Sequence, residues 1–259
     1  MSPATAARVR NVAAPLAIFV LFVALWQASV FNDLLGLETF AVPLPDHIVE
    51  AASDNASSLW SAFRQTFAAV LLGYALGNGL GFLLALLLLA LPHGAARRTG
   101  AVFTAFQALP IIAIAPLVAL WIPDSLWFKA VVVTIMVFPS MLVYAWRGMS
   151  GVPPEALELM ASYRASTRQV LTGLRIPAAV PQVFTALKYT TVLALIGVVV
   201  CEILKSHDGL GYEIHDALQK FSTPLAWSAV AVLALVGIAT YTLLVLLERV
   251  LFPWAARRG

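Results

Sequence analysis

The chain has 259 residues, of which 61% are hydrophobic and only 11% are charged, and its mean hydropathy is +0.89. A soluble domain is about 45–50% apolar and about 25% charged, so this composition favours a membrane protein. The net charge of +3 and the scattered basic residues argue against a nucleic-acid partner. A single cysteine, Cys201, excludes an internal disulfide and a cysteine-rich metal site, and we expect no metal.

Six apolar stretches are long enough to cross a bilayer, because a spanning helix needs about 20 mostly apolar residues. Backbone groups in lipid must bond within their own segment, so each stretch is predicted to be a helix. We expect a single all-α transmembrane domain over residues 1–259, with spans at 13–31, 66–91, 101–122, 127–147, 181–202 and 225–248. The first span follows Arg8 and Arg10 without a convincing cleavage site, and is interpreted as a retained helix rather than a cleaved signal.

The second and third predicted spans contain helix-packing and helix-bending residues. The second carries three glycines spaced four residues apart: Gly73, Gly77 and Gly81. That spacing places them on one helix face and predicts the close approach of another helix, while the nearby Asn78 predicts a hydrogen bond between helices. In the third span, Pro110 and Pro116 predict kinks, which either bend the helix around a pathway or are static.

Two charged residues lie in the fifth predicted span. Lys188 is about seven residues in, roughly 10 Å from the start of the span. A charge at the bilayer centre costs about 2.5–3.5 kcal/mol. Lys188 is therefore expected to extend to the cytoplasmic surface, to form an internal ion pair, or to face an aqueous path. Glu202, at the outer end, either lines an outer mouth or marks the interface.

Lysine and arginine residues predict that both termini are cytoplasmic, because cytoplasmic loops carry an excess of these residues. In this orientation the inside segments hold eleven of them: Arg8, Arg10, Arg97, Arg98, Arg147, Arg164, Arg168, Arg175, Arg249, Arg257 and Arg258. The outside segments hold four: Arg64, Lys129, Lys205 and Lys220.

The longest cytoplasmic connection, at about 150–179, has a helix–turn–helix pattern. Pro154 predicts the first helix start, and an apolar stripe follows at i, i+3, i+4 and i+7, formed by Ala156, Leu159, Met160 and Tyr163. Ser166 and Gln169 predict a capping box for a second short helix, which Pro177 is expected to end. The stripe needs a partner, either the cytoplasmic ends of this chain's own helices or a groove on another protein.

The segment from Glu158 to Ser166, with Pro177 at the matching spacing, resembles the EAA loop of permease subunits of bacterial ABC importers. Arg164 occupies the position where that family usually has glycine. In the family this loop forms a coupling helix in a cleft of the cytoplasmic ATPase subunit. The resemblance therefore implies that the residues contacting the ATPase are Glu155, Glu158, Leu159, Met160, Tyr163, Arg164, Ala165 and Ser166.

The resemblance extends over nearly the whole chain. Pro110, Ala113, Pro116-Leu117 and Trp121 resemble a run found in the nitrate, sulfonate and taurine group, although Ile122-Pro123-Asp124 replaces the W-F-G that normally follows. Gly209-Leu-Gly-Tyr212 resembles the outer loop after the fifth helix. Two segments, Leu157–Tyr163 and Thr185–Lys188, look most like importers of thiamine-pyrimidine precursors or riboflavin. The translocation pathway is expected to involve Pro110, Pro116, Trp121, Lys188 and Glu202.

The resemblance implies the type I ABC importer permease fold in the bacterial cytoplasmic (inner) membrane, surrounded by lipid. It also implies a second permease copy in a homodimer, two copies of an ATP-binding subunit and an external substrate-binding protein. The chain lacks G-x-x-x-x-G-K-[ST], so ATP and magnesium are expected on the partner subunit, with no cofactor and no catalytic residue here.

Two other classes of function were considered. A self-sufficient secondary transporter or channel is the main alternative, although no acidic residue lies in the middle of a predicted span. A membrane enzyme is disfavoured, because the sequence has no H-E-x-x-H motif and no G-x-S-x-G with a plausible histidine. The expected function is ATP-driven import of a small polar solute.

Overall fold

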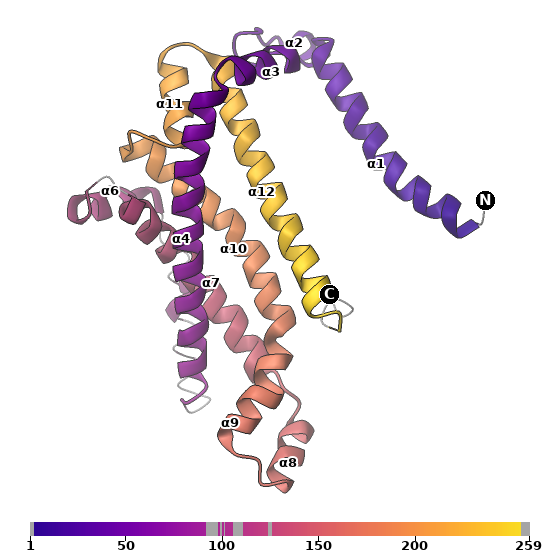
Figure 1. The fold of residues 1–259 in the computed structure, drawn as a ribbon, viewed down its shortest axis with the longest axis vertical. Helices are drawn as coiled ribbons and strands as arrows, with labels where there is room; N and C mark the ends of the chain where they lie inside the picture. Colours follow the sequence, from indigo (N-terminus) through magenta and orange to yellow (C-terminus); the bar gives the residue numbers. More distant parts are fainter. Residues whose placement is uncertain are drawn as a thin grey trace. The chain divides into compact units, whose positions relative to one another are not determined.

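A computed structural model describes residues 3–91, 98, 100, 102–105, 111–123 and 126–254. Every element in these ranges is a helix. The chain divides into two compact units, one comprising Met1–Trp60 and Glu213–Ala231, the other Ser61–Tyr212 and Val232–Gly259. Figure 1 labels the helices in chain order.

Four helices are long and apolar enough to cross a membrane: α4 (Ala56–Leu88), α7 (Leu126–Ser150), the continuous run Thr167–Lys205 that contains α10 (Ile176–Lys205), and α12 (Thr223–Leu251). They confirm four of the six predicted spans. Each of these segments begins before the predicted start, and α4 does so by ten residues. At about 1.5 Å per residue, even the shortest exceeds the roughly 30 Å hydrocarbon thickness, so they extend beyond the lipid core.

The first predicted span ends earlier than expected, and the third lies only partly within the described residues. α1 (Pro3–Gln27) ends before residue 31, and Ser29 adopts a left-handed backbone conformation, with φ 60°, before α2 (Val30–Leu35) begins. Of the predicted span 101–122, the structure describes α6 (Ile111–Trp121), while several of residues 101–110 lie outside the described residues. The eleven residues of α6 reach about 16 Å, and because the rest of this span is only partly described, its crossing of the bilayer stays a prediction.

The first unit contains α1, α2, α3 (Pro45–Asp54), the end of α11 (Leu210–Gln219) and the flanking parts of α4 and α12. Side chains on α2 and α12 donate hydrogen bonds to backbone carbonyl groups of the loop that precedes α3. Thr223 donates to the carbonyl of Phe40 at 2.5 Å, and Asn32 donates to that of Val42 at 3.0 Å. The first bond joins the start of α12 to the loop before α3, and the second joins α2 to the same loop.

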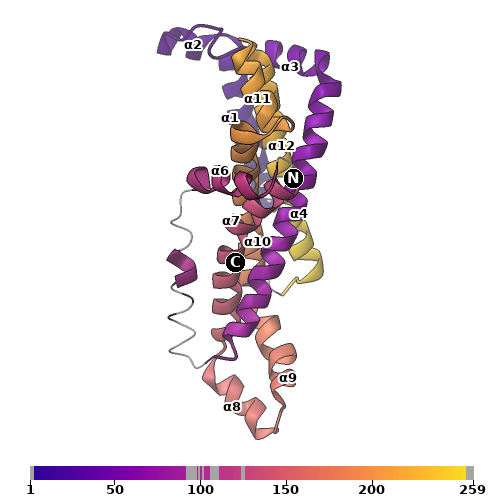
Figure 2. The ribbon, with the colours of Figure 1, turned by 90° about the vertical axis from the view of Figure 1, so that its left-hand side faces the viewer.

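The second unit is organised around α7, which Figures 1 and 2 show alongside α4 and α10. The apolar window of α7 is 61% buried, compared with 33% for α4 and 39% for the run containing α10. The glycine face of α4 packs on α7: a Cβ on Gly73 would lie 2.5 Å from Val133 Cβ, and one on Gly77 would lie 2.8 Å from Val137 Cβ. The predicted tight packing is therefore confirmed.

Hydrogen bonds also join α4 to α10. Asn78 accepts from the Thr190 hydroxyl at 3.1 Å, which confirms the predicted bond between helices. The hydroxyl of Tyr74 donates to the carbonyl of Leu187 at 2.9 Å. These contacts set α4, α7 and α10 as one packed group within the unit.

The prediction that Pro177 ends a helix is wrong. α9 (Thr167–Val170) continues through a π-helical turn (Leu171–Arg175) directly into α10. In that turn the N–H of Ile176 bonds to the carbonyl of Leu171, five residues earlier. Pro177 then falls in the first turn of α10, where a proline's missing N–H and fixed φ are tolerated.

Candidate functional site

The loop that is predicted to be cytoplasmic forms an exposed helix. α8 (Pro154–Ser162) begins at the predicted proline, has Glu155 in its first turn, and contains no buried residue. Leu159 is 57% exposed and Tyr163 is 77% exposed, while Met160 is partly buried and Glu158 is exposed. Within the described residues, the chain's own helices leave the Leu159 and Tyr163 part of the predicted apolar stripe uncovered.

Arg164 adopts the conformation that explains the glycine usual at this position. Its φ is 53°, in the left-handed region that favours glycine. The N–H of Ala165 bonds to the carbonyl of Met160 at 3.0 Å, and that of Arg164 bonds to Ala161 at 2.9 Å. This pair of bonds is a Schellman motif, which ends α8 and turns the chain toward α9.

The predicted capping box then starts the next helix. The Ser166 side chain accepts from the backbone N–H of Gln169 at 3.3 Å, and the Gln169 side chain accepts from the backbone N–H of Ser166 at 2.7 Å. The loop is thus a rigid helix–turn–helix hairpin, not a flexible linker.

The base of the hairpin is fixed where α7 meets α10. Arg175 donates to the carbonyl of Met149 at 3.2 Å. A Cβ on Gly148 would lie 2.8 Å from the Cα of Ala179, so the two backbones are in close contact there. Figures 1 and 2 show α8 and α9 beyond the ends of α7 and α10. A force on α8 would therefore be transmitted to these two long helices.

At the other end of the same helices, Glu202 is the centre of a buried polar cluster. Its carboxylate, which has no exposed surface, is 3.4 Å from the ammonium of Lys129 on α7. It accepts from the Thr66 hydroxyl on α4 at 2.8 Å and from the backbone N–H of Gly211 on α11 at 2.9 Å. We call Thr66, Lys129, Glu202, Asp208 and Gly211 the outer cluster, because the charge distribution predicts that this end faces outside.

Two glycines allow α11 to approach Glu202. Gly209 has φ 99°, and a Cβ there would overlap the Glu202 carboxylate. A Cβ on Gly211 would lie 2.7 Å from the Cβ of Glu202. The Gly-Leu-Gly sequence is therefore required by the close contact between α11 and the buried carboxylate.

Glu202 was predicted to line an outer mouth or to mark the interface; the structure places it, fully buried, near the end of α10, and its role in the translocation pathway stays a prediction. The sequence predicted for Lys129 only a position on the outer side, and no partner. A sequence signal for the pair was present: Lys129 follows the start of one predicted span and Glu202 ends another, so both lie on the same predicted side of the membrane. Opposite charges placed in this way are candidates for an ion pair, since a buried charge needs a partner.

Lys188 forms an internal ion pair, one of its three predicted environments. Its partner is Glu248 on α12, and the side chains are 21% and 11% exposed. The fifth and sixth predicted spans are joined by this bond. A role for Lys188 in the translocation pathway stays a prediction.

The remaining pathway residues are not brought together in the described structure. Pro110 lies outside the described residues. Pro116 is partly buried inside α6, and Trp121, at the end of that helix, is 81% exposed. Their roles in the pathway also stay predictions.

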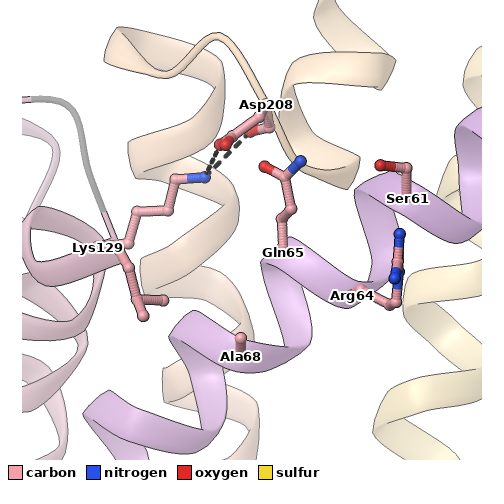
Figure 3. Close-up of a pocket in the computed structure, with 7 residues that line it drawn as sticks. Ser61, Arg64, Gln65, Ala68, Lys129 and Asp208 are labelled. Atoms are coloured by element: carbon pink, nitrogen blue, oxygen red, sulfur yellow. Dashed lines mark hydrogen bonds and ion pairs between the residues drawn. The ribbon is translucent and has the colours of Figure 1, made fainter.

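A polar pocket of about 380 Å³ adjoins the outer cluster, and Figure 3 shows most of its lining. We call it the outer pocket; it is lined by Ser61, Arg64, Gln65, Ala68, Leu126, Lys129 and Asp208. Asp208 pairs with Lys129 and accepts from the Ser206 hydroxyl at 2.9 Å. This pocket is not apparent from the sequence, because its residues come from two helices and a loop far apart in the chain.

Comparisons with known proteins agree with this arrangement. The model of a family described as "binding-protein-dependent transport system inner membrane component" matches residues 77–257. The chain is 29% identical to the formylaminopyrimidine transport permease protein ThiX of Halalkalibacterium halodurans, over 94% of this chain and 96% of that protein. It is 33% identical to the riboflavin transport system permease protein RibX of Chloroflexus aurantiacus, covering 93% and 90%. A putative aliphatic sulfonates transport permease protein, SsuC of Bacillus subtilis, is 26% identical, covering 90% and 84%.

Solved structures share the fold. A bacterial alginate ABC transporter, in complex with an alginate-bound periplasmic protein, aligns with a TM-score of 0.63 at 15% identity, over 94% of this chain and 96% of the other. The methionine transporter MetNI in an inward-facing conformation aligns with a TM-score of 0.54 at 17% identity, covering 73% and 94%. At these identities the likeness shows the fold, which is that of ABC importer permeases, as expected.

Proposed function

Since the chain belongs to the family of binding-protein-dependent transport system inner membrane components, we propose that it forms the translocation pathway of an ATP-driven importer. It is a multi-pass protein of the inner membrane. Its full-length relatives are permease proteins for formylaminopyrimidine, riboflavin and aliphatic sulfonates. The proposed cargo is a small polar solute of one of these kinds, delivered by an extracytoplasmic substrate-binding protein.

The exposed face of α8 carries the proposal. Leu159 and Tyr163 present apolar surface that no described part of the chain covers, next to the acidic Glu158. An amphipathic helix of this kind is suited to a groove on another protein. We assign that groove to a cytoplasmic ATP-binding subunit, present in two copies, which binds ATP and magnesium. A second copy of this chain would complete the pathway.

In this mechanism, ATP-driven closure of the partner subunits displaces α8. The hairpin is rigid, and its base is tied to α7 and α10 through Arg175 and Gly148. The displacement is therefore transmitted along both helices to Lys129 and Glu202 at their far ends. Because the outer cluster also holds α4 and the start of α11, the helices move together and access to the pathway changes.

The test is Glu158→Lys, which reverses a charge on the docking face without removing a buried group. We expect loss of ATP-driven uptake and of co-purification with the ATP-binding subunit, while the amount of chain in the membrane is unchanged. Glu50→Lys is the matched control, because Glu50 is also exposed and belongs to α3, which is not part of the loop at 150–179. Normal uptake by the Glu158→Lys variant would refute the docking assignment.

A secondary transporter or channel would work without a partner. ATP-independent accumulation of solute by the chain alone in lipid vesicles would support that alternative and overturn the proposal.

A further inference from the structure

The outer pocket contains two cationic side chains, but the ammonium of Lys129 has no free donor. An ammonium has three N–H groups. Those of Lys129 face three protein acceptors: Glu202 Oε1 at 3.4 Å, the Asp208 backbone oxygen at 3.1 Å, and the Asp208 carboxylate. An incoming anion could reach this cation only by displacing Asp208.

The charges around the pocket also cancel. Lys129 and Arg64 supply two positive charges, while Asp208 and the buried Glu202 behind it supply two negative charges. Arg64 is exposed, so its attraction for an anion is weakened by water and salt. The pocket therefore lacks the excess positive charge that selects an anionic solute.

Three groups in the pocket remain available to a ligand. The side chains of Arg64 and Ser61 form no hydrogen bond or ion pair with any part of the chain that the structure describes. Rotating the Gln65 amide by 180° lets its nitrogen donate to both oxygens of the Asp208 carboxylate, and turns its carbonyl oxygen toward the side on which Ser61 and Arg64 lie in Figure 3.

These groups fit a particular kind of molecule. The guanidinium of Arg64 is planar and can stack on a flat ring while its edge donates hydrogen bonds. The Ser61 hydroxyl donates and accepts, the Gln65 carbonyl accepts from an amino group, and Ala68 and Leu126 add apolar surface. A volume of about 380 Å³ is within the range of small-molecule sites.

From this arrangement we infer that the outer pocket is the entry site for the transported solute. It takes a small, uncharged heteroaromatic ring carrying an amino group, in preference to an inorganic or sulfonate anion. The inference rests on the proposed transport function and adds the chemical class of the solute.

The buried thiol of Cys201 makes a direct test possible, because a cysteine placed in the pocket becomes the reactive one. The permease complex carrying Ser61→Cys is reconstituted in nanodiscs, and the rate of its labelling by a small methanethiosulfonate is measured. We expect a saturating aminopyrimidine to slow labelling at least threefold. Nitrate and an alkanesulfonate, at equal ionic strength, should leave the rate unchanged.

Two further variants isolate the pocket chemistry. Adding Gln65→Leu should remove the protection by the aminopyrimidine, whereas Gln219→Leu, at an exposed glutamine outside the pocket, should retain it. Adding Asp208→Asn removes one negative charge and frees a Lys129 donor, so nitrate should then slow labelling.

Protection by an anion without Asp208→Asn, or no protection by the ring compound, would overturn the inference. ATP-driven uptake by the wild-type complex is measured in parallel. Uptake combined with either of those labelling results refutes only the solute class. A complex with its partner subunits that transports nothing refutes the transport function itself.

Discussion

Replacing Lys129 with methionine is expected to destabilise the chain more than any other single removal of a positive charge. The Lys129 side chain is 3% exposed and that of Glu202 is 0% exposed. The Lys129→Met variant keeps a similar side-chain length but leaves the buried carboxylate without its cation. Removing one partner of a buried ion pair costs about 3–5 kcal/mol. At about 2–4 °C per kcal/mol for a chain of this size, the unfolding midpoint should fall by about 6–20 °C.

The chain contains its own reporter for this measurement. Cys201 is the single cysteine, is buried, and is adjacent to Glu202. A thiol-reactive fluorophore added to the purified chain during heating should therefore react only as α10 separates from α7. Lys205→Met is the matched control, because Lys205 is exposed near the end of the same helix and should shift the midpoint by no more than about 1–2 °C.

The double variant Lys129→Met/Glu202→Gln completes the cycle. Glu202→Gln removes the buried charge while keeping groups that can bond to Thr66 and Gly211. The double variant should therefore lose less stability than the sum of the two single variants. If Lys129→Met matches Lys205→Met, or if the two losses add, the cluster is not held by this ion pair and the reasoning is refuted.

Three further predictions concern the backbone and helix contacts. Gly209→Ala should reduce the free energy of unfolding by at least about 1–3 kcal/mol and so lower the unfolding midpoint, because φ is 99° and the new Cβ overlaps the Glu202 carboxylate. An unchanged midpoint would contradict this prediction. Gly77→Leu should separate α4 from α7 and lower the midpoint, whereas Gly79→Leu, with no atom within 4 Å of its Cβ position, should be tolerated. Arg164→Gly should stabilise the turn after α8 by up to about 1 kcal/mol, which would slow hydrogen exchange at the amide of Ala165. Arg168→Gly, inside α9, should instead destabilise the loop by a similar amount, because glycine is a poor helix former. A change of the same sign in both variants would refute the left-handed conformation of Arg164.

The features that sequence analysis predicted correctly are local in the chain. Apolar runs located the helices α4, α7, α10 and α12, because lipid requires long stretches of apolar residues with internally bonded backbone. The Pro154 start of α8 and the Ser166–Gln169 capping box also depend on neighbouring residues. The prediction at Pro177 failed for a local reason as well, since a π-helical turn lets the helix continue into a proline.

The outer cluster and the outer pocket depend on residues distant in the chain. Lys129 and Glu202 are separated by 73 positions, and Thr66 and Glu202 by 136. No periodicity connects them, and only helix packing brings their side chains within hydrogen-bonding distance. The sequence by itself determined that this chain enters a membrane and that the connection at 150–179 forms two short helices, because hydrophobicity and capping act over neighbouring residues. Tertiary structure alone decided which charges are buried together, because a buried charge is tolerated only where packing supplies its partner.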